Sequence, residues 1–129
     1  MNKKLMILDC TIRDGGFENN FNFTTHEVKK TLKTSSEIGY NYFEMGYLTD
    51  LKILSESDGL WRNVPFQLIS EIKTKVDPKC KLSVMIDCWR YNIDDLLPSK
   101  ETDIDLIRVC SYEEQTDMAL DMCKKIKEL

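Results

Sequence analysis

Short runs of apolar residues alternate along the chain with stretches in which apolar residues recur every three or four positions. Continuous apolar runs are typical of strands buried on both faces of a parallel sheet, and the helical spacing is typical of amphipathic helices. The predicted strands cover residues 5–10, 42–45, 82–87 and 104–110. Helical sequence follows each strand, so the pattern predicts repeated βα units and an α/β fold with a parallel sheet.

Several helical segments carry recognisable end signals. Thr24, with Glu27 three positions later, predicts a capping box at the start of a helix that ends at Gly39. Further helices are predicted over residues 65–76 and 113–129. The residues of the last helix expected in the core are Met118, Leu120, Met122 and Ile126.

Four βα units are compatible with two architectures. A small open α/β sheet would be complete at 129 residues, whereas an eight-stranded barrel needs about 250 residues, so that this chain would supply one half. Periodicity alone does not distinguish them. In both cases residues 1–129 form one domain, with 42% hydrophobic residues available for a core.

The charge and cysteine content narrow the functional classes. The net charge of -4 argues against a broad attraction to nucleic acid or to anionic membranes. The five cysteines are odd in number and form no CxxC pair, which indicates reduced thiols in a cytoplasmic protein. The apolar run near the start is too short for a signal peptide core or a membrane span.

The segment LDCTIRDGG, residues 8–16, concentrates charged and flexible residues directly after the first predicted strand. Read structurally, Arg13 and Asp14 would be an ion pair in a loop, and the two glycines would supply positive φ angles in a tight turn. The segment also resembles the signature of the DRE-TIM metallolyases. This superfamily includes 4-hydroxy-2-oxovalerate aldolase, hydroxymethylglutaryl-CoA lyase and isopropylmalate synthase.

The resemblance extends beyond this motif. Residues 39–46 and 107–110 are similar to the family's second and fourth strands, so the likeness covers essentially the whole chain in barrel order. It implies a curved parallel sheet that forms the (β/α)4 N-terminal half of a TIM (β/α)8 barrel, with the C-terminal half absent. Within the family, the 4-hydroxy-2-oxovalerate aldolase-like branch is the most similar.

The resemblance implies a set of site residues. Asp14 stands at the position of the family's metal ligand, which implies Mn²⁺ or Mg²⁺ as cofactor, and Arg13 stands at the position that stabilises an enolate oxygen. Glu44, near the end of the second strand, is a second candidate catalytic residue, with a structural ion pair to a neighbouring Arg or Lys as the alternative. Arg108, inside the fourth strand, is expected either to contact substrate or to form a structural salt bridge to Glu44 or Asp87. The implied reaction forms or cleaves a C–C bond next to a 2-oxoacid through a pyruvate-like enolate.

The sequence departs from the family at two points. His26 is its one histidine, so the family's His-x-His metal ligands are missing, and Phe17 stands where the aldolase branch places a catalytic histidine. The catalytic base is therefore unassigned, with Asp9 and Glu44 as candidates. We expect an aldolase or carbon–carbon lyase in the full-length form and no activity of this chain alone.

A second hypothesis is a non-catalytic half-barrel remnant that acts as a binding or oligomerising module. Open sheet edges invite pairing with another chain. The expected protein partner is therefore either further copies of the chain or a missing C-terminal half-barrel. The aldolase resemblance adds a small 2-oxoacid substrate, and we expect neither nucleic acid nor a membrane as a partner.

Overall fold

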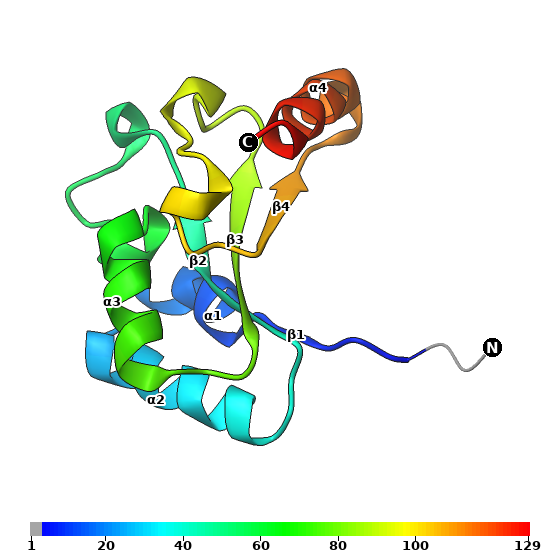
Figure 1. Cartoon of the computed structure of the whole chain (residues 1–129). Helices are drawn as coiled ribbons and strands as arrows, with labels where there is room; N and C mark the ends of the chain where they lie inside the picture. Colours follow the sequence, from blue (N-terminus) through cyan, green and yellow to red (C-terminus); the bar gives the residue numbers. More distant parts are fainter. Residues whose placement is uncertain (1–3) are drawn as a thin grey trace.

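Four parallel strands form one sheet in which spatial neighbours follow the order of the chain. The computed structural model describes residues 4–129 (Figure 1). The strands are β1 (Leu8–Asp9), β2 (Tyr42–Leu48), β3 (Lys81–Asp87) and β4 (Leu106–Cys110). An uninterrupted 1-2-3-4 order is that of a barrel, whereas doubly wound sheets reverse their order at a switch point. The chain therefore has the predicted (β/α)4 half-barrel fold.

Helices separate the strands. They are α1 (Thr11–Asn19), α2 (Thr25–Glu37), α3 (Phe66–Val76) and α4 (Thr116–Lys127). Helices α2 and α3 contact each other and lie together on one side of the sheet, while α4 lies beside β4 near the C-terminus (Figure 1). Short 3₁₀ turns occupy the loops: η1 (Leu51–Ile53), η2 (Leu60–Arg62), η3 (Ile93–Asp95), η4 (Ser99–Glu101) and η5 (Glu113–Gln115).

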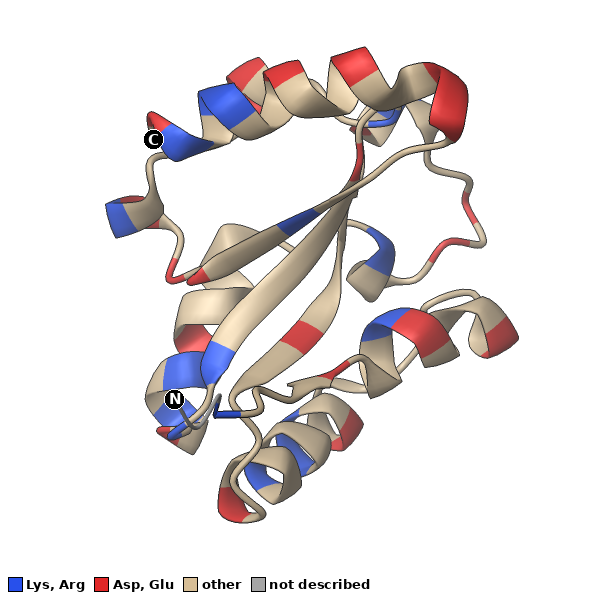
Figure 2. Ribbon diagram, turned by 90° about the vertical axis from the view of Figure 1, so that its right-hand side faces the viewer, with Lys and Arg blue, Asp and Glu red and all other residues tan. Residues whose placement is uncertain are grey.

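The hydrophobic core lies between the sheet and the α2–α3 layer. Its fully buried members come from β2, β3 and these two helices: Phe43, Met45, Leu82, Val84, Ile86, Val28, Leu32, Ile69 and Ile72. Side chains alternate between the two faces of a strand. The opposite face, the inner face of the half barrel, consequently receives Glu44 and its register partner Ser83. Charged residues otherwise gather on the helices, and the strands carry few of them (Figure 2).

The predicted capping box is confirmed at the start of α2. The Glu27 carboxylate accepts from the Thr24 backbone N–H at 2.7 Å, and the Thr24 hydroxyl accepts from the Glu27 N–H at 3.2 Å. Gly39 follows the helix with a φ of +86°, as expected of a helix terminator. No helix within residues 4–129 is long and apolar enough to cross a membrane.

The prediction for the first strand was too long. Only Leu8–Asp9 form β1, and the preceding Leu5, Met6 and Ile7 are 81%, 59% and 41% exposed. The apolar run suggested a strand covered on both faces, but β1 is an edge strand that pairs only with β2 in the described chain. The second strand, by contrast, continues beyond the predicted end at Met45 to Leu48.

Two further expectations were wrong. Gly15 and Gly16 do not form a tight turn with positive φ, because both lie inside α1, which begins immediately after β1. In α4, Met122 is buried, but Met118 and Leu120 are 50% and 54% exposed. This helix packs against β4, the last strand of the sheet. Fewer of its apolar residues are therefore covered than the sequence pattern suggested.

Candidate active site

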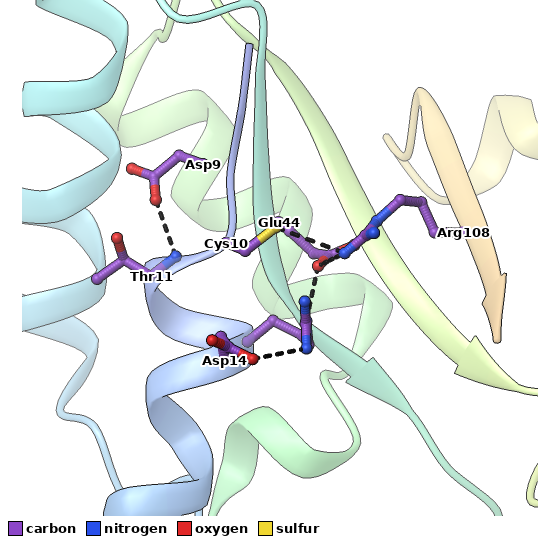
Figure 3. Close-up of polar contacts among 7 residues, drawn as sticks. Asp9, Cys10, Thr11, Asp14, Glu44 and Arg108 are labelled. Carbon is purple, nitrogen blue, oxygen red and sulfur yellow. Dashed lines mark hydrogen bonds and ion pairs between the residues drawn. The ribbon is translucent and has the colours of Figure 1, made fainter.

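A buried carboxylate, Glu44 of β2, forms the centre of a polar cluster on the inner face. Arg108 of β4 donates from Nε to Oε1 at 2.8 Å and from Nη2 to Oε2 at 2.6 Å. Arg13 of α1 donates from Nε to Oε2 at 2.9 Å. Three charge-assisted hydrogen bonds therefore hold both carboxylate oxygens, with Arg108 approaching from the β4 side (Figure 3).

Local structure delivers Arg13 to this position. The Asp14 N–H donates to the Cys10 carbonyl at 2.8 Å, so α1 starts at the carboxyl end of β1 with no intervening loop. Ile12 is 1% exposed and anchors the first turn in the core. Its neighbour Arg13 consequently extends to the inner face of the sheet, where its side chain is 15% exposed.

The two arginines determine the charge state of Glu44. Burial alone would raise the pKa of this carboxyl group, but the hydrogen bonds and charges of Arg108 and Arg13 outweigh burial and hold the pKa below its ordinary value. Burial in turn lowers the pKa of the Arg13 guanidinium, and the contacts with Glu44 raise it by more. Glu44 is therefore ionised at neutral pH, with both oxygens occupied. Such a carboxylate is better suited to fixing a guanidinium than to removing a proton.

Asp14 lies at the exposed side of the cluster. Its side chain is 73% exposed, and its Oδ1 accepts from Arg13 Nη1 at 3.0 Å (Figure 3). The structure thus brings Arg13 and Asp14, which follow the carboxyl end of β1, beside Glu44. Glu44 is the third residue of β2, so the prediction that it lies near the end of its strand was wrong. Barrel enzymes place their functional residues at the carboxyl ends of the strands, where Arg13 and Asp14 lie.

The donor set around Asp14 does not form a metal site by itself. Within residues 4–129, no group of three or more His, Cys, Asp or Glu side chains is arranged to hold a metal ion. Asp14 offers one carboxylate, whereas Mg²⁺ and Ca²⁺ sites assemble about six or more oxygen ligands. His26, on α2, is exposed and lies outside this cluster.

The structure removes Asp9 from the candidate bases. Its carboxylate accepts from the Thr11 N–H at 2.8 Å and from the Ser35 hydroxyl of α2, on the helix side of the sheet (Figure 3). Burial would raise the pKa of Asp9, but these hydrogen bonds lower it below its ordinary value. Asp9 is the register partner of Phe43, whose side chain lies in the core on the helix side. Glu44 follows Phe43 in β2 and therefore faces the other side of the sheet, away from Asp9.

Sequence reasoning did not identify Arg62, a second arginine near the carboxyl end of β2. The guanidinium of Arg62, in η2, lies 4.5 Å from the ring centroid of Tyr47 in β2. Burial raises the pKa of the Tyr47 hydroxyl, and the nearby Asp87 adds to this shift. Arg62 does not directly follow a strand and matches no motif. It can be recognised as a candidate site residue only from the tertiary packing of η2 on β2.

Comparisons with known proteins agree with the half-barrel fold. No family model matches the chain. A 4-hydroxy-2-oxovalerate aldolase from Brevibacillus brevis is 24% identical over 129 residues, which are 100% of this chain and 38% of that protein. A crystal structure described as the N-terminal domain of a "putative aldolase" from Bacteroides vulgatus has a TM-score of 0.83 and 27% identity, covering 96% of this chain and 41% of that chain. The chain thus spans about two fifths of the length of these relatives, and the match fits their N-terminal half.

Proposed function

We propose that this chain, which corresponds to the N-terminal half of an aldolase barrel, supplies the enolate-stabilising residues of an aldolase or carbon–carbon lyase. The supporting observation is the guanidinium of Arg13, which follows the carboxyl end of β1 and is fixed by the buried Glu44 carboxylate beside Asp14. Forming or cleaving a C–C bond next to a 2-oxoacid places negative charge on the oxygen of a pyruvate-like enolate. A preorganised guanidinium stabilises such charge as it develops.

Each residue of the cluster has a distinct role in this proposal. Arg13 uses Nε and Nη1 within the protein, which leaves its Nη2 to donate to a substrate oxygen. Glu44 is a positioning residue that acts through Arg13, and Arg108 holds Glu44 from the opposite side. The residue that would accept the proton of the 4-hydroxyl group is unassigned, and Phe17, at the position of the family's histidine, has no group that could accept it.

We expect oxalate, a planar mimic of the pyruvate enolate, to bind this chain through Arg13. The Arg13→Gln variant should bind oxalate about tenfold more weakly, since it loses a charge-assisted hydrogen bond. Glu44 keeps Arg108 as its counterion in this variant. Two-dimensional NMR of the arginine Nε–H groups would measure both dissociation constants.

A matched control for the oxalate experiment is Lys30→Gln, which removes the same charge from the exposed surface of α2. Its affinity for oxalate should equal that of the parent chain. Equal affinities of Arg13→Gln and the parent would count against an enolate site and would favour the non-catalytic half barrel.

The predicted Mn²⁺ or Mg²⁺ cofactor belongs to this proposal as well, with Asp14 as the one ligand from this chain and the other ligands from elsewhere in a full-length protein. We expect Mn²⁺ to bind this chain alone with a dissociation constant of about 1 mM or weaker, given a single carboxylate. Asp14→Asn should abolish that binding, which water-proton relaxation would detect. Asp121→Asn, an equally exposed carboxylate on α4, is the control. Micromolar binding, or binding retained in Asp14→Asn, would contradict the assignment.

The alternative of an oligomerising half barrel has its own supporting observation. Strands β1 and β4 each have one unpaired edge within the described residues, and exposed apolar side chains precede β1. Such edges accept a further strand. We therefore propose two possible protein partners: further copies of the chain, or a complementary C-terminal half barrel. The proposed small-molecule partner is a 2-oxoacid, and the proposed location is the cytoplasm, as predicted from the sequence.

A further inference from the structure

A cavity of about 540 Å³ lies at the carboxyl ends of β2 and β3, beside the Arg13 cluster. Phe17, one turn along α1 from Arg13, forms part of its wall. Thr49, directly after β2, and Arg62, in η2, also line it and are 2% and 7% exposed. Cavities of this size commonly hold small molecules that a few convergent polar groups orient.

Two residues of this wall each have a buried polar atom without a partner. Thr49 Oγ1 and Arg62 Nη1 are buried and form no hydrogen bond with any of residues 4–129. A third such atom, Ser83 Oγ, lies on the inner face beside Glu44 instead. Buried donors without partners cost stability and are rare. Two of them belong to residues that line one cavity, where a ligand would supply the missing acceptors.

The Arg62 guanidinium is held by aromatic rings rather than by acidic side chains. Its central carbon lies 4.5 Å from the ring centroid of Tyr47, 5.0 Å from that of Phe21 and 5.8 Å from that of Phe17. The ion pairs of the described residues do not include Arg62. Rings stacked against a guanidinium leave its N–H edges available, and these edges match the planar geometry of a carboxylate.

The chain accepts backbone strain to place one of these rings. Phe21 has a φ of +60°, which is uncommon for a residue other than glycine. Its ring packs on Gly16, where a Cβ atom would lie 2.1 Å from the ring, and its carbonyl packs on Gly59, where a Cβ atom would lie 2.0 Å away. Gly16 therefore makes room for the ring of Phe21 that supports Arg62, and Gly59 makes room for its backbone.

The charges around the cavity favour an anion with a single charge. Arg62 and Arg90 are its cationic residues and Asp58 is its one anionic residue, which leaves an excess of one positive charge. The Asp58 carboxylate already accepts from the Ser55 N–H at 2.8 Å and from the Ser55 hydroxyl at 3.1 Å. A carboxylate matches this excess better than a phosphate dianion does.

We propose that this cavity binds a carboxylate group of a small organic acid, with the Arg62 guanidinium as its main partner and the Thr49 hydroxyl as a second donor. The identity of the ligand rests on the proposed function. The carboxylate is then a second acidic group of the substrate, at the opposite end from the 2-oxoacid group that binds Arg13. The substrate class is then a dicarboxylic 4-hydroxy-2-oxoacid or its cleavage product.

Succinate is a suitable probe, because it carries carboxylates but no 2-oxo group. Titrated into the metal-free chain and followed by two-dimensional NMR, it should bind with a dissociation constant of about 1–10 mM and shift the signals of Thr49 and Phe17. Arg62→Lys, which keeps the charge but loses the planar fork, should bind succinate about tenfold more weakly. Lys30→Gln, on the exposed surface of α2, should bind it as the parent does.

The Thr49→Val variant distinguishes a role of Thr49 in ligand binding from a role in stability. Valine has nearly the same shape and removes only a hydroxyl that lacks a partner, so the Tm should stay the same or rise. Succinate affinity should nevertheless fall at least threefold, because a hydrogen bond to the ligand is lost. A residue with a merely structural role would not lose affinity while keeping its stability.

Several results would overturn this assignment. They are no succinate binding up to about 50 mM, unchanged affinity in both Arg62→Lys and Thr49→Val, or tighter binding of inorganic phosphate than of succinate. In Arg13→Gln, succinate should still shift the signals of Thr49, and adding Arg62→Lys should still weaken its binding. A failure of the enolate proposal in the oxalate experiment would therefore be distinguishable from a failure of this one.

Discussion

Replacing Glu44 with alanine is expected to lower the free energy of unfolding by about 3–5 kcal/mol, because it leaves two arginines without their shared counterion. Glu44 is fully buried, and the Arg13 and Arg108 side chains are 15% and 35% exposed. Removing one member of a buried ion pair is costly, since the remaining charge stays poorly solvated. Urea denaturation followed by circular dichroism would measure the loss.

The matched control for Glu44 is Asp121→Ala, which breaks the ion pair with Lys124 on the surface of α4, where the two side chains are 72% and 75% exposed. Exposed pairs contribute little, so this loss should be below about 1 kcal/mol. Similar losses in the two variants would contradict a stabilising role for the buried cluster.

The pH dependence of the Glu44→Ala effect follows from the lowered pKa of Glu44. A carboxyl group with a lower pKa in the folded state binds fewer protons there, so its contribution is complete above the pKa of the unfolded state. It is lost as the pH falls through the folded-state pKa. The difference in unfolding free energy between the parent and Glu44→Ala should therefore be largest near pH 7 and smaller below about pH 4.

Gly46→Ala is expected to cost about 2–5 kcal/mol, from a strained backbone and a steric overlap together. Gly46 has a φ of +153°, and a Cβ atom there would lie 2.2 Å from the Trp61 carbonyl oxygen and 3.0 Å from Val64 Cγ2. The overlap involves backbone, so β2 and η2 would have to separate. Urea denaturation would measure the cost, and succinate titration would show whether Arg62 has moved.

Gly39→Ala provides the control for Gly46→Ala. Gly39 also has a positive φ, +86°, but a Cβ atom there would have no neighbour within 4 Å. Its cost should be limited to the backbone penalty, about 1–2 kcal/mol. The excess cost of Gly46→Ala over Gly39→Ala measures the close approach of η2 to β2, and no excess would contradict it.

The strand pattern was predictable because the half barrel buries its strands against helices, which requires continuous apolar runs. The same rule failed at residues 5–7, which precede the edge strand β1 and whose apolar side chains are exposed. It also failed at Gly15 and Gly16. Glycine is a poor helix former, but the packing of Phe21 on Gly16 favours a residue without a side chain within α1.

Only those residues of the candidate site that belong to a sequence motif were predictable. The Arg13–Asp14 pair follows from the resemblance. The contact of Arg13 with Glu44 does not, because Glu44 lies inside β2 and not at its end. Arg62 and Thr49 could not be found in this way, because their proximity depends on a loop that returns to β2 through a glycine contact. Distances of this kind are set by tertiary packing, and no local sequence pattern encodes them.

The Glu44 cluster also bears on how the chain folds during synthesis. Glu44 is separated from Arg13 by 31 positions and from Arg108 by 64. A nascent chain that has not yet emerged as far as β4 carries Glu44 with only one of its two cations, so the inner face is unfinished until the last strand docks. Such non-local dependence raises contact order, which slows folding. It also ties the first and last βα units into one cooperative transition.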